Sequence, residues 1–216
     1  MDPANQENFV SRFDREALLW DSNPGRVAVA RAIANAIIRH VPLSRSMDIM
    51  DYGAGTGLIT LSLQPLVRSI TAVDTSREML KVLGDKLLGL GADNVTTRLL
   101  DLEKTRDALG GFDAIVTSMT LHHVRDTFTL FRRFCESLKS GGWIAAADLD
   151  TEDGTFHPDS TGVHHHGFDR EQLRDLLQRA GFVDIAMHDA HCFSKPGVGG
   201  KTREYSIFLA TARKRA

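Results

Sequence analysis

The chain has 216 residues, of which 42% are hydrophobic and 25% charged, a composition that indicates a folded globular protein and excludes a disordered one. Its 26 basic and 28 acidic residues give a formal charge of −2, so it lacks the positive field that gathers nucleic acid, and no nucleic-acid partner is expected. Its two cysteines form no CxxC or zinc-ligand spacing, and there is no leader-like start or membrane-length apolar run, so we expect a cytoplasmic protein with no membrane partner.

The first part of the chain is predicted to be helical. Residues 4–20 and 26–40 each place apolar side chains at helical spacing, and a Pro-Gly break separates them. No repeat, low-complexity stretch or inter-domain linker follows, so residues 1–216 are expected to form one domain.

After residue 45 the pattern alternates between strands and helices. Strands are predicted over residues 46–51, 68–74, 94–100, 112–118, 143–149, 182–188 and 204–212. Helices are predicted over residues 58–66, 77–90, 127–139 and 168–180, with Ser76 as an N-cap and Gly141-Gly142 closing the third of them. Such alternation, with apolar strands, predicts a doubly wound α/β fold in which ligands bind beyond the carboxyl ends of the strands.

A glycine-rich loop, residues 51–57 (DYGAGTG), follows the first predicted strand and opens a helix. Glycines let a ligand approach the backbone, and the helix start offers free N–H groups. A dinucleotide fingerprint would need a third glycine at Leu58 or Thr60, and a phosphate-binding P-loop would need a lysine after Gly57. The loop therefore favours a nucleoside ligand with little or no phosphate charge.

Three aspartates lie at the expected strand ends. Asp51 opens the glycine loop, Asp74 ends the second strand, and Asp101 follows the third. Asp74 can accept hydrogen bonds from both hydroxyls of a ribose, and Asp101 can accept one from an adenine amino group. Acids disfavour a pyrophosphate but suit a sulfonium cation that carries an ammonium group, so the charge pattern favours S-adenosylmethionine. A lone strand-end aspartate often only caps a loop.

Taken together, these motifs resemble class I S-adenosylmethionine-dependent methyltransferases of the small-molecule type. The resemblance spans roughly residues 45–212 and is carried by residues 51–57, 73–76, 100–102, 112–118 and 121–124 and by the glycine pair before Trp143. It implies a mostly parallel, Rossmann-like seven-stranded sheet whose last strand is antiparallel and inserted as a hairpin. It also implies a helical lid over residues 1–42, a cofactor-binding core over residues 45–216, and S-adenosyl-L-methionine as the cofactor.

The resemblance further implies which residues contact the cofactor. The loop residues would face the methionine part, Asp74 would hold the ribose, Asp101 and the backbone of Leu102 would meet the adenine, and the backbone of Ser118 would meet the amino group. Trp20 would lie on the bound cofactor, although an aromatic packed in a core or interface fits its pattern equally. The expected cofactor contacts are Trp20, Asp51, Gly53, Ala54, Gly55, Asp74, Thr75, Met79, Asp101, Leu102 and Ser118.

Histidines gather at two places in the sequence. His122 and His123 follow the fourth strand, where the methyl group should emerge, so they are candidates for a general base, His123 first; packing roles remain open for both. The long polar loop over residues 151–167, which includes His157 and His164 to His166, suits a substrate lid. Because adjacent side chains of an extended segment alternate in direction, no metal site is predicted there.

The sequence thus predicts methyl transfer by direct displacement to a small molecule with an oxygen, nitrogen or carbon nucleophile. Two alternatives stay open: a non-catalytic module that binds S-adenosylmethionine, and a nicotinamide-dependent oxidoreductase, for which the third glycine and a Tyr-x-x-x-Lys pair are missing. The sequence does not indicate the acceptor or the oligomeric state.

Overall fold

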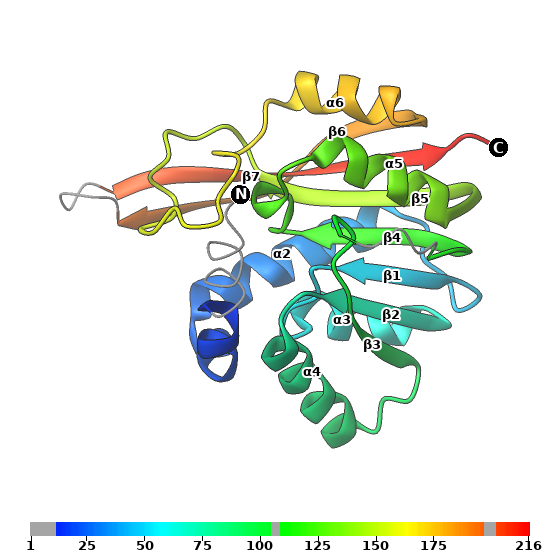
Figure 1. The fold of residues 1–216 in the computed structure, drawn as a ribbon, viewed down its shortest axis with the longest axis horizontal. Helices are drawn as coiled ribbons and strands as arrows, with labels where there is room; N and C mark the ends of the chain where they lie inside the picture. The colour runs from blue at the N-terminus through cyan, green and yellow to red at the C-terminus, as the bar shows by residue number, and fades with distance from the viewer. Residues whose placement is uncertain (1–11, 105–108, 197–201) are drawn as a thin grey trace.

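A seven-stranded sheet in the order β3-β2-β1-β4-β5-β7-β6 forms the centre of the protein (Figure 1). This computed structural model describes residues 12–104, 109–196 and 202–216. The strands are β1 Asp48–Tyr52, β2 Ser69–Asp74, β3 Val95–Leu99, β4 Phe112–Ser118, β5 Leu138–Leu149, β6 Phe182–Pro196 and β7 Thr202–Lys214. Strands β1 to β5 pair in parallel, and β7 is antiparallel to both β5 and β6. The predicted doubly wound sheet with an antiparallel hairpin strand is confirmed.

The order of the strands fixes where a ligand can bind. From β1 the chain proceeds outward to β2 and β3, then returns to place β4 on the other side of β1. The connections after β1 and β4 therefore diverge, which leaves a crevice beyond the carboxyl ends of these two strands. In Figure 1 these ends point to the left, toward the N-terminal segment and the loop that follows β5.

Helices cover both faces of the sheet because successive strand residues point to opposite sides. On β1, Ile49 packs among side chains of α2 and α3, whereas Met50 packs among those of α5 and α6. The helices are α2 Pro24–His40, α3 Leu58–Leu63, α4 Arg77–Leu90, α5 Thr127–Ser137 and α6 Arg170–Arg179, with short 3-10 segments η1 Ala17–Ser22, η2 Gln64–Leu66 and η3 Leu121–His123. Among the described residues, none of the helices has both the length and the apolar character that a membrane span requires.

The start of α4 confirms one predicted cap, and the end of α5 corrects another. The hydroxyl of Ser76 accepts a hydrogen bond from the backbone N–H of Met79. Helix α5 ends at Ser137, before the glycine pair, because Leu138 is extended and pairs with Phe112 of β4. Gly141 and Gly142 lie inside β5 and do not close the helix.

The two final strands are longer than predicted. Beyond the pair formed by Leu149 and Ile207, β7 is no longer paired with β5, and β6 and β7 continue together to the pair formed by Pro196 and Thr202. This part of the hairpin projects past the sheet in Figure 1. Exposed and partly buried side chains largely alternate along residues 189–195, so this part of the sequence lacks the apolar run that the prediction required.

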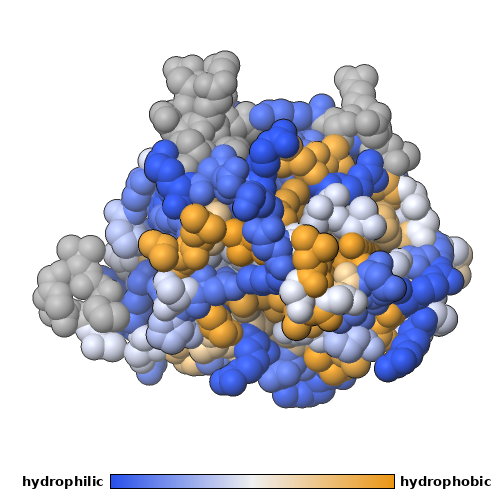
Figure 2. All heavy atoms as spheres, turned by 90° about the horizontal axis from the view of Figure 1, so that it is seen from below, coloured by the Kyte–Doolittle hydropathy of each residue, from blue (hydrophilic) through white to orange (hydrophobic). Residues whose placement is uncertain are grey.

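The exposed edge of the sheet is mixed in character. Figure 2 views the molecule from the side of α4 and β3 and shows hydrophobic patches interspersed with hydrophilic residues. The side chains of Leu88 and Leu90 on α4 and Leu99 on β3 are 82%, 68% and 47% exposed. The edge strand β3 is therefore largely uncovered, with four of its five residues exposed.

Candidate functional site

Three glycines shape the loop between β1 and α3. Gly53, Gly55 and Gly57 have φ angles of 74°, 56° and 84°, a region that L-residues rarely adopt. A Cβ on Gly53 would lie 2.1 Å from Oγ1 of Thr120, and one on Gly57 would lie 2.2 Å from Cδ1 of Leu83. A Cβ on Gly55 would meet nothing within 4 Å. Two glycines are thus required by protein packing, whereas Gly55 faces open space that a ligand can occupy.

The carboxylate of Asp74 holds this loop in place. Its Oδ2 accepts a hydrogen bond of 2.7 Å from the backbone N–H of Gly55, and its Oδ1 accepts one of 2.8 Å from the N–H of Ser76. A carboxylate offers about four acceptor positions, so these bonds leave acceptor capacity for a ribose hydroxyl. Burial raises the pKa of Asp74, against the opposing effect of these hydrogen bonds.

Asp51 lies behind the loop. Its side chain is buried, and its Oδ2 accepts a hydrogen bond of 2.6 Å from the hydroxyl of Thr60 in α3. Burial raises the pKa of Asp51 to about 7, and the nearby carboxylate of Asp74 adds to the effect. This geometry makes Asp51 a residue that positions the loop and α3, while direct contact with the cofactor stays a prediction.

Asp101 lies at the same end of the sheet as Asp74, where the carboxyl ends of β2 and β3 meet. The backbone N–H of Leu100 donates a hydrogen bond of 3.0 Å to the carbonyl of Asp74, which brings the chain after β3 beside the end of β2. Asp101 is partly buried, accepts a hydrogen bond from the N–H of Glu103 and pairs with Lys104 at 3.3 Å. It therefore caps its own loop, and the other predicted role, binding an adenine, remains open because the carboxylate has further acceptor positions.

Two further aspartates fasten the N-terminal segment over the loop. Residues 12–16 are helical and lead into η1, while the predicted helical residues 4–11 lie outside the described part of the chain. Asp14 accepts a hydrogen bond of 2.5 Å from the hydroxyl of Ser76, at the start of α4. Asp21 accepts one of 2.6 Å from the hydroxyl of Thr56 and also pairs with Lys86. Sequence reasoning missed both residues, since acids in a polar helical segment carry no distinguishing signal.

The lid also carries aromatic side chains toward the site. The ring of Phe13 lies 5.5 Å from that of Trp20 and 5.6 Å from that of His123. The guanidinium of Arg26 lies 3.7 Å from the centre of the Trp20 ring. Trp20 therefore has partners within the protein, and its expected contact with the cofactor stays a prediction.

The turn after β4 completes the rim of the crevice. The hydroxyl of Thr120, which lies against Gly53, donates a hydrogen bond of 3.0 Å to the carbonyl of Ser118. Met119 has a φ of 52°, a strained conformation that often occurs at functional sites. Of the remaining predicted contacts, Met79 and Leu102 are buried and Thr75 is partly buried, all close to the strand ends.

The predicted histidine pair stands on η3, directly after this turn. His122 is 1% exposed, and its Nδ1 lies 2.7 Å from Oδ1 of the buried Asp148 at the end of β5. His123 is partly buried, and its Nδ1 bonds to the carbonyl of Gly162 at 2.9 Å. Burial lowers the pKa of His123 well below its usual value, so the ring is neutral at neutral pH.

The loop over residues 151–167 brings a third histidine to this pair. The ring of His157 lies 4.9 Å from that of His122 and 5.5 Å from that of His123. Burial lowers the pKa of His157 to about 4, and neighbouring cationic groups contribute. The loop thus places His157 beside the histidine pair, whereas His166 pairs with Glu152 at 3.5 Å. Its role as a substrate lid stays a prediction.

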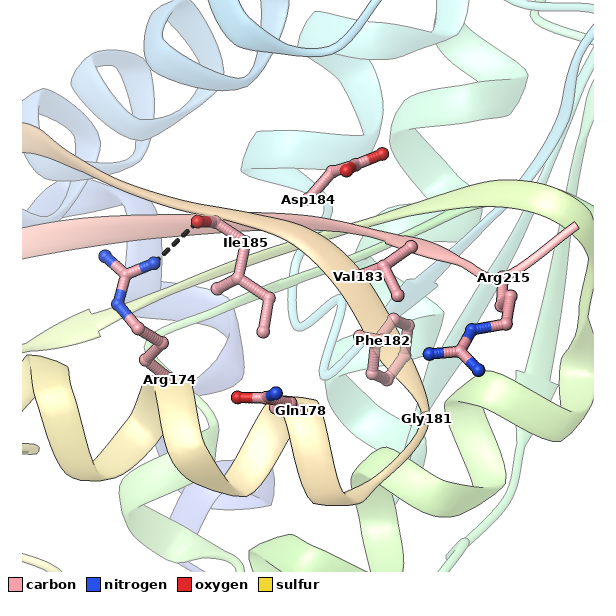
Figure 3. Close-up of a pocket in the computed structure, with 8 residues that line it drawn as sticks. All are labelled: Arg174, Gln178, Gly181, Phe182, Val183, Asp184, Ile185 and Arg215. Carbon is pink, nitrogen blue, oxygen red and sulfur yellow. Dashed lines mark hydrogen bonds between the residues drawn. The ribbon is translucent and has the colours of Figure 1, made fainter.

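A separate groove lies far from these residues. It has a volume of about 620 Å³ between α6 and the first residues of β6, and Arg174, Phe182 and Arg215 are among its lining residues (Figure 3). Phe182, the first residue of β6, pairs with Lys214, and the neighbouring Arg213 pairs with Trp143 in the first half of β5. The groove therefore lies at the end of the sheet opposite the carboxyl ends of the parallel strands. It is not the crevice that the strand order defines.

The sequence of the chain matches known methyltransferases. A family model described as a methyltransferase domain matches residues 26–186. An uncharacterized methyltransferase of Schizosaccharomyces pombe is 31% identical over 150 residues, which cover 62% of this chain and 52% of that protein. A ubiquinone biosynthesis O-methyltransferase of Caulobacter vibrioides is 26% identical over 165 residues, covering 69% and 64% of the two chains. The chain spans about half the length of the first of these curated relatives.

Solved structures share the fold at lower sequence identity. A SAM-dependent methyltransferase from Aquifex aeolicus has a TM-score of 0.68 at 18% identity, with 94% of this chain and 97% of that chain covered. The phosphoethanolamine N-methyltransferase 2 of Haemonchus contortus, in complex with phosphomonomethylethanolamine and S-adenosylhomocysteine, also has a TM-score of 0.68 at 18% identity, with 85% and 53% covered. Because the family model covers most of the chain, and the glycine loop, strand-end acids and sheet order agree with it, the chain belongs to the class I S-adenosylmethionine-dependent methyltransferase family.

Proposed function

We propose that this chain transfers the methyl group of S-adenosylmethionine to a small organic molecule through an oxygen, nitrogen or carbon nucleophile. The observation that carries the proposal is the open space at Gly55, which lies beside the Asp74 carboxylate and next to the lid fastened by Asp21. The cofactor, when bound, supplies a methyl group already activated by its sulfonium. The protein then has to align the nucleophile and exclude water, which requires no catalytic triad.

The cofactor contacts follow from the positions of the residues around this space. We assign the loop backbone, through Gly53, Ala54 and Gly55, to the methionine part and Asp74 to the ribose hydroxyls. Further assignments concern the adenosine, the amino group and the lid. They are Thr75, Met79, Asp101 and Leu102 around the adenosine, Ser118 at the amino group and Trp20 above the cofactor.

A small acceptor is supported by charge and by the cover over the crevice. The N-terminal segment and the loop after β5 meet where Arg12 pairs with Asp159 at 3.8 Å, and a cover of this kind would suit a small acceptor. The net charge of −2 disfavours nucleic acid. Two of the similar proteins are a ubiquinone biosynthesis O-methyltransferase and a phosphoethanolamine N-methyltransferase, and both names refer to small molecules.

The compartment is part of the same proposal. Free thiols at Cys135 and Cys192 support a reducing, cytoplasmic compartment.

A general base is needed only when the acceptor must lose a proton during attack. Of the two predicted histidines, His123 is the more accessible, since His122 is 1% exposed and its Nδ1 is held by Asp148. If His123 is that base, His123→Ala lowers turnover and leaves cofactor affinity unchanged. Normal turnover in that variant would show that His123 is not a general base.

The proposal is tested by binding and turnover in the same preparation. Titration calorimetry with S-adenosylhomocysteine should show one site, and a panel of phenols, amines and carboxylic acids should contain an acceptor that yields S-adenosylhomocysteine and a methylated product. Gly55→Val is the inactive control. Binding without turnover on a broad panel would favour a non-catalytic module, binding of NADH instead would favour an oxidoreductase, and no binding of either would overturn the proposal.

A further inference from the structure

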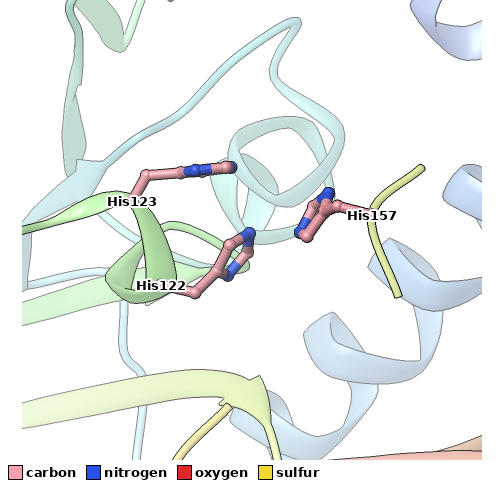
Figure 4. Close-up of side chains that lie close together, drawn as sticks. All are labelled: His122, His123 and His157. Carbon is pink, nitrogen blue, oxygen red and sulfur yellow. The ribbon is translucent and has the colours of Figure 1, made fainter. Parts of the chain in front are cut away.

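Three imidazole rings converge above the carboxyl ends of β4 and β5. His122 and His123 come from η3, and His157 comes from the loop after β5 (Figure 4). Each ring offers one nitrogen, and these three nitrogens all lie within 4.8 Å of one another. A zinc ion held among them would form bonds of about 2.0–2.1 Å to each nitrogen.

Two of the rings form, through Nδ1, the kind of hydrogen bond that metal-bound histidines form with the nitrogen that faces away from the metal. Nδ1 of His122 bonds to the carboxylate of Asp148 at 2.7 Å, and Nδ1 of His123 bonds to the carbonyl of Gly162 at 2.9 Å. Both acceptors take an N–H from Nδ1, which leaves Nε2 as the nitrogen of each ring that would bind a metal. Metal-bound histidines almost always donate their other N–H to a carboxylate or carbonyl in this manner, which fixes the orientation of the ring.

The third ring supplies an independent observation. Nε2 of His157 is buried and has no hydrogen-bond partner among the described residues. Buried polar atoms are nearly always satisfied, so an unpaired nitrogen next to two oriented imidazoles calls for a ligand. A cation held by all three rings would satisfy it.

We propose that His122, His123 and His157 bind one divalent transition-metal ion of the Zn²⁺ type. Neutral imidazoles suit zinc, iron, cobalt and nickel, whereas magnesium and calcium require oxygen ligands. Three histidines also leave a coordination position open, as in catalytic zinc sites. The proposal departs from the sequence prediction of no metal site, which considered His157 only with other residues of its own loop.

The site would also define part of the acceptor, and this step rests on the proposed function. An acceptor oxygen, from a hydroxyl or a carboxylate, would take the open position, and a bound hydroxyl releases its proton to solvent at lower pH than a free one. A nitrogen that holds the metal cannot accept a proton. His123 would therefore bind the metal in place of acting as the general base.

The test uses the full chain without a histidine tag, freed of metal with a chelator and titrated with CoCl₂ and ZnCl₂ alone. We expect one Co²⁺ per chain with visible absorption of four- or five-coordinate geometry, displaced by Zn²⁺ but not by excess Mg²⁺. His157→Ala should weaken Co²⁺ binding by on the order of 100-fold or more, since loss of an outer contact alone costs 10–100-fold. His123→Ala should do the same. His166→Ala, which changes an exposed histidine of the same loop, should have no effect.

The outcomes separate the metal site from the cofactor site. Calorimetry with S-adenosylhomocysteine, run on each variant, reports that the protein is folded and whether the cofactor binds, independently of Co²⁺. Failure of cofactor binding with intact Co²⁺ binding would contradict only the proposed function. Absence of a Co²⁺ site in the unaltered chain, equal Co²⁺ affinity in folded His157→Ala, or loss of the site in His166→Ala would overturn the metal proposal.

Discussion

The backbone N–H of Gly55 donates a hydrogen bond of 2.7 Å to the carboxylate of Asp74, so the end of β2 fixes the shape of the loop that follows β1. The same carboxylate also bonds the N–H of Ser76, which opens α4. One side chain thus connects two strand ends and one helix start around the crevice. The loop and the start of α4 are therefore held in place before any ligand enters the crevice.

Replacement of Asp74 should weaken cofactor binding more than it weakens the fold. Asp74→Ala removes both the predicted ribose contact and the bond that shapes the loop, at a cost of about 1.5–3 kcal/mol in binding. Asp74→Asn retains one acceptor oxygen and should give an intermediate loss. Calorimetry with S-adenosylhomocysteine measures both variants. Asp85→Ala, an exposed acid on α4, is the control, and unchanged affinity in Asp74→Ala would contradict the ribose role.

The two glycines Gly55 and Gly57 should respond differently to the same substitution. Gly57→Ala places a Cβ 2.2 Å from Leu83, so overpacking should lower the free energy of unfolding by about 1–3 kcal/mol, in addition to backbone strain. The Cβ of Gly55→Ala would meet no protein atom within 4 Å, so this variant should lose cofactor affinity. Its free energy of unfolding should fall only by the backbone strain of an alanine at positive φ. Gly55→Val should abolish binding in a folded protein.

Urea unfolding and calorimetry on the two alanine variants check this contrast. The expected pattern is a stability loss that is larger at Gly57 and a binding loss that is larger at Gly55. The reverse pattern would show that the open space at Gly55 is not where the cofactor binds.

Buried Asp51 should make stability depend on pH. Its pKa is about 7 in the folded protein, against 3.8 for an aspartate free in water, so between about pH 4 and pH 7 the folded state holds a proton that the unfolded state has lost. The contribution of Asp51 to stability therefore falls as the pH rises through this window, by on the order of a few kcal/mol, and the loss is complete above pH 7.

Urea unfolding between pH 4.5 and pH 8, compared with Asp51→Asn, isolates this effect from that of other carboxylates. The difference in unfolding free energy between the two proteins should shift in favour of the asparagine variant as the pH rises. Thr60→Val, which removes the hydroxyl that lowers the pKa of Asp51, should move the window to higher pH. Parallel pH curves for Asp51→Asn and the unaltered protein would refute the raised pKa.

The lid should loosen when Asp21 is replaced. Asp21→Ala removes the bonds to Thr56 and Lys86 that hold η1 against the glycine loop and α4, so cofactor binding should weaken by about 1 kcal/mol. Limited proteolysis should cut the lid faster in this variant, and S-adenosylhomocysteine should slow that cleavage. Asp85→Ala again serves as the matched control. Equal proteolysis rates with and without Asp21 would mean that these bonds do not hold the lid.

The sequence by itself determined the strand and helix order, the sheet type and the position of the crevice. These depend on local periodicity and on the alternation of strands with helices, both of which are visible along the chain. The glycine loop and Asp74 were found for the same reason, since they occupy fixed places at strand ends. The predicted bounds were wrong where strand pairing, and not burial, decides how far an element extends. Examples are the long hairpin of β6 and β7 and the end of α5, where Leu138 pairs with β4.

Only the tertiary structure decided which distant side chains meet. It brought Asp14 and Asp21 onto α4 and the glycine loop, and it placed His157 beside His122 and His123 while His166 pointed elsewhere. The path of a long loop depends on every surface that it contacts, so no spacing within the sequence encodes such a convergence. The sequence therefore predicts the end of the sheet at which the proposed chemistry takes place, and the folded chain reveals which side chains meet there.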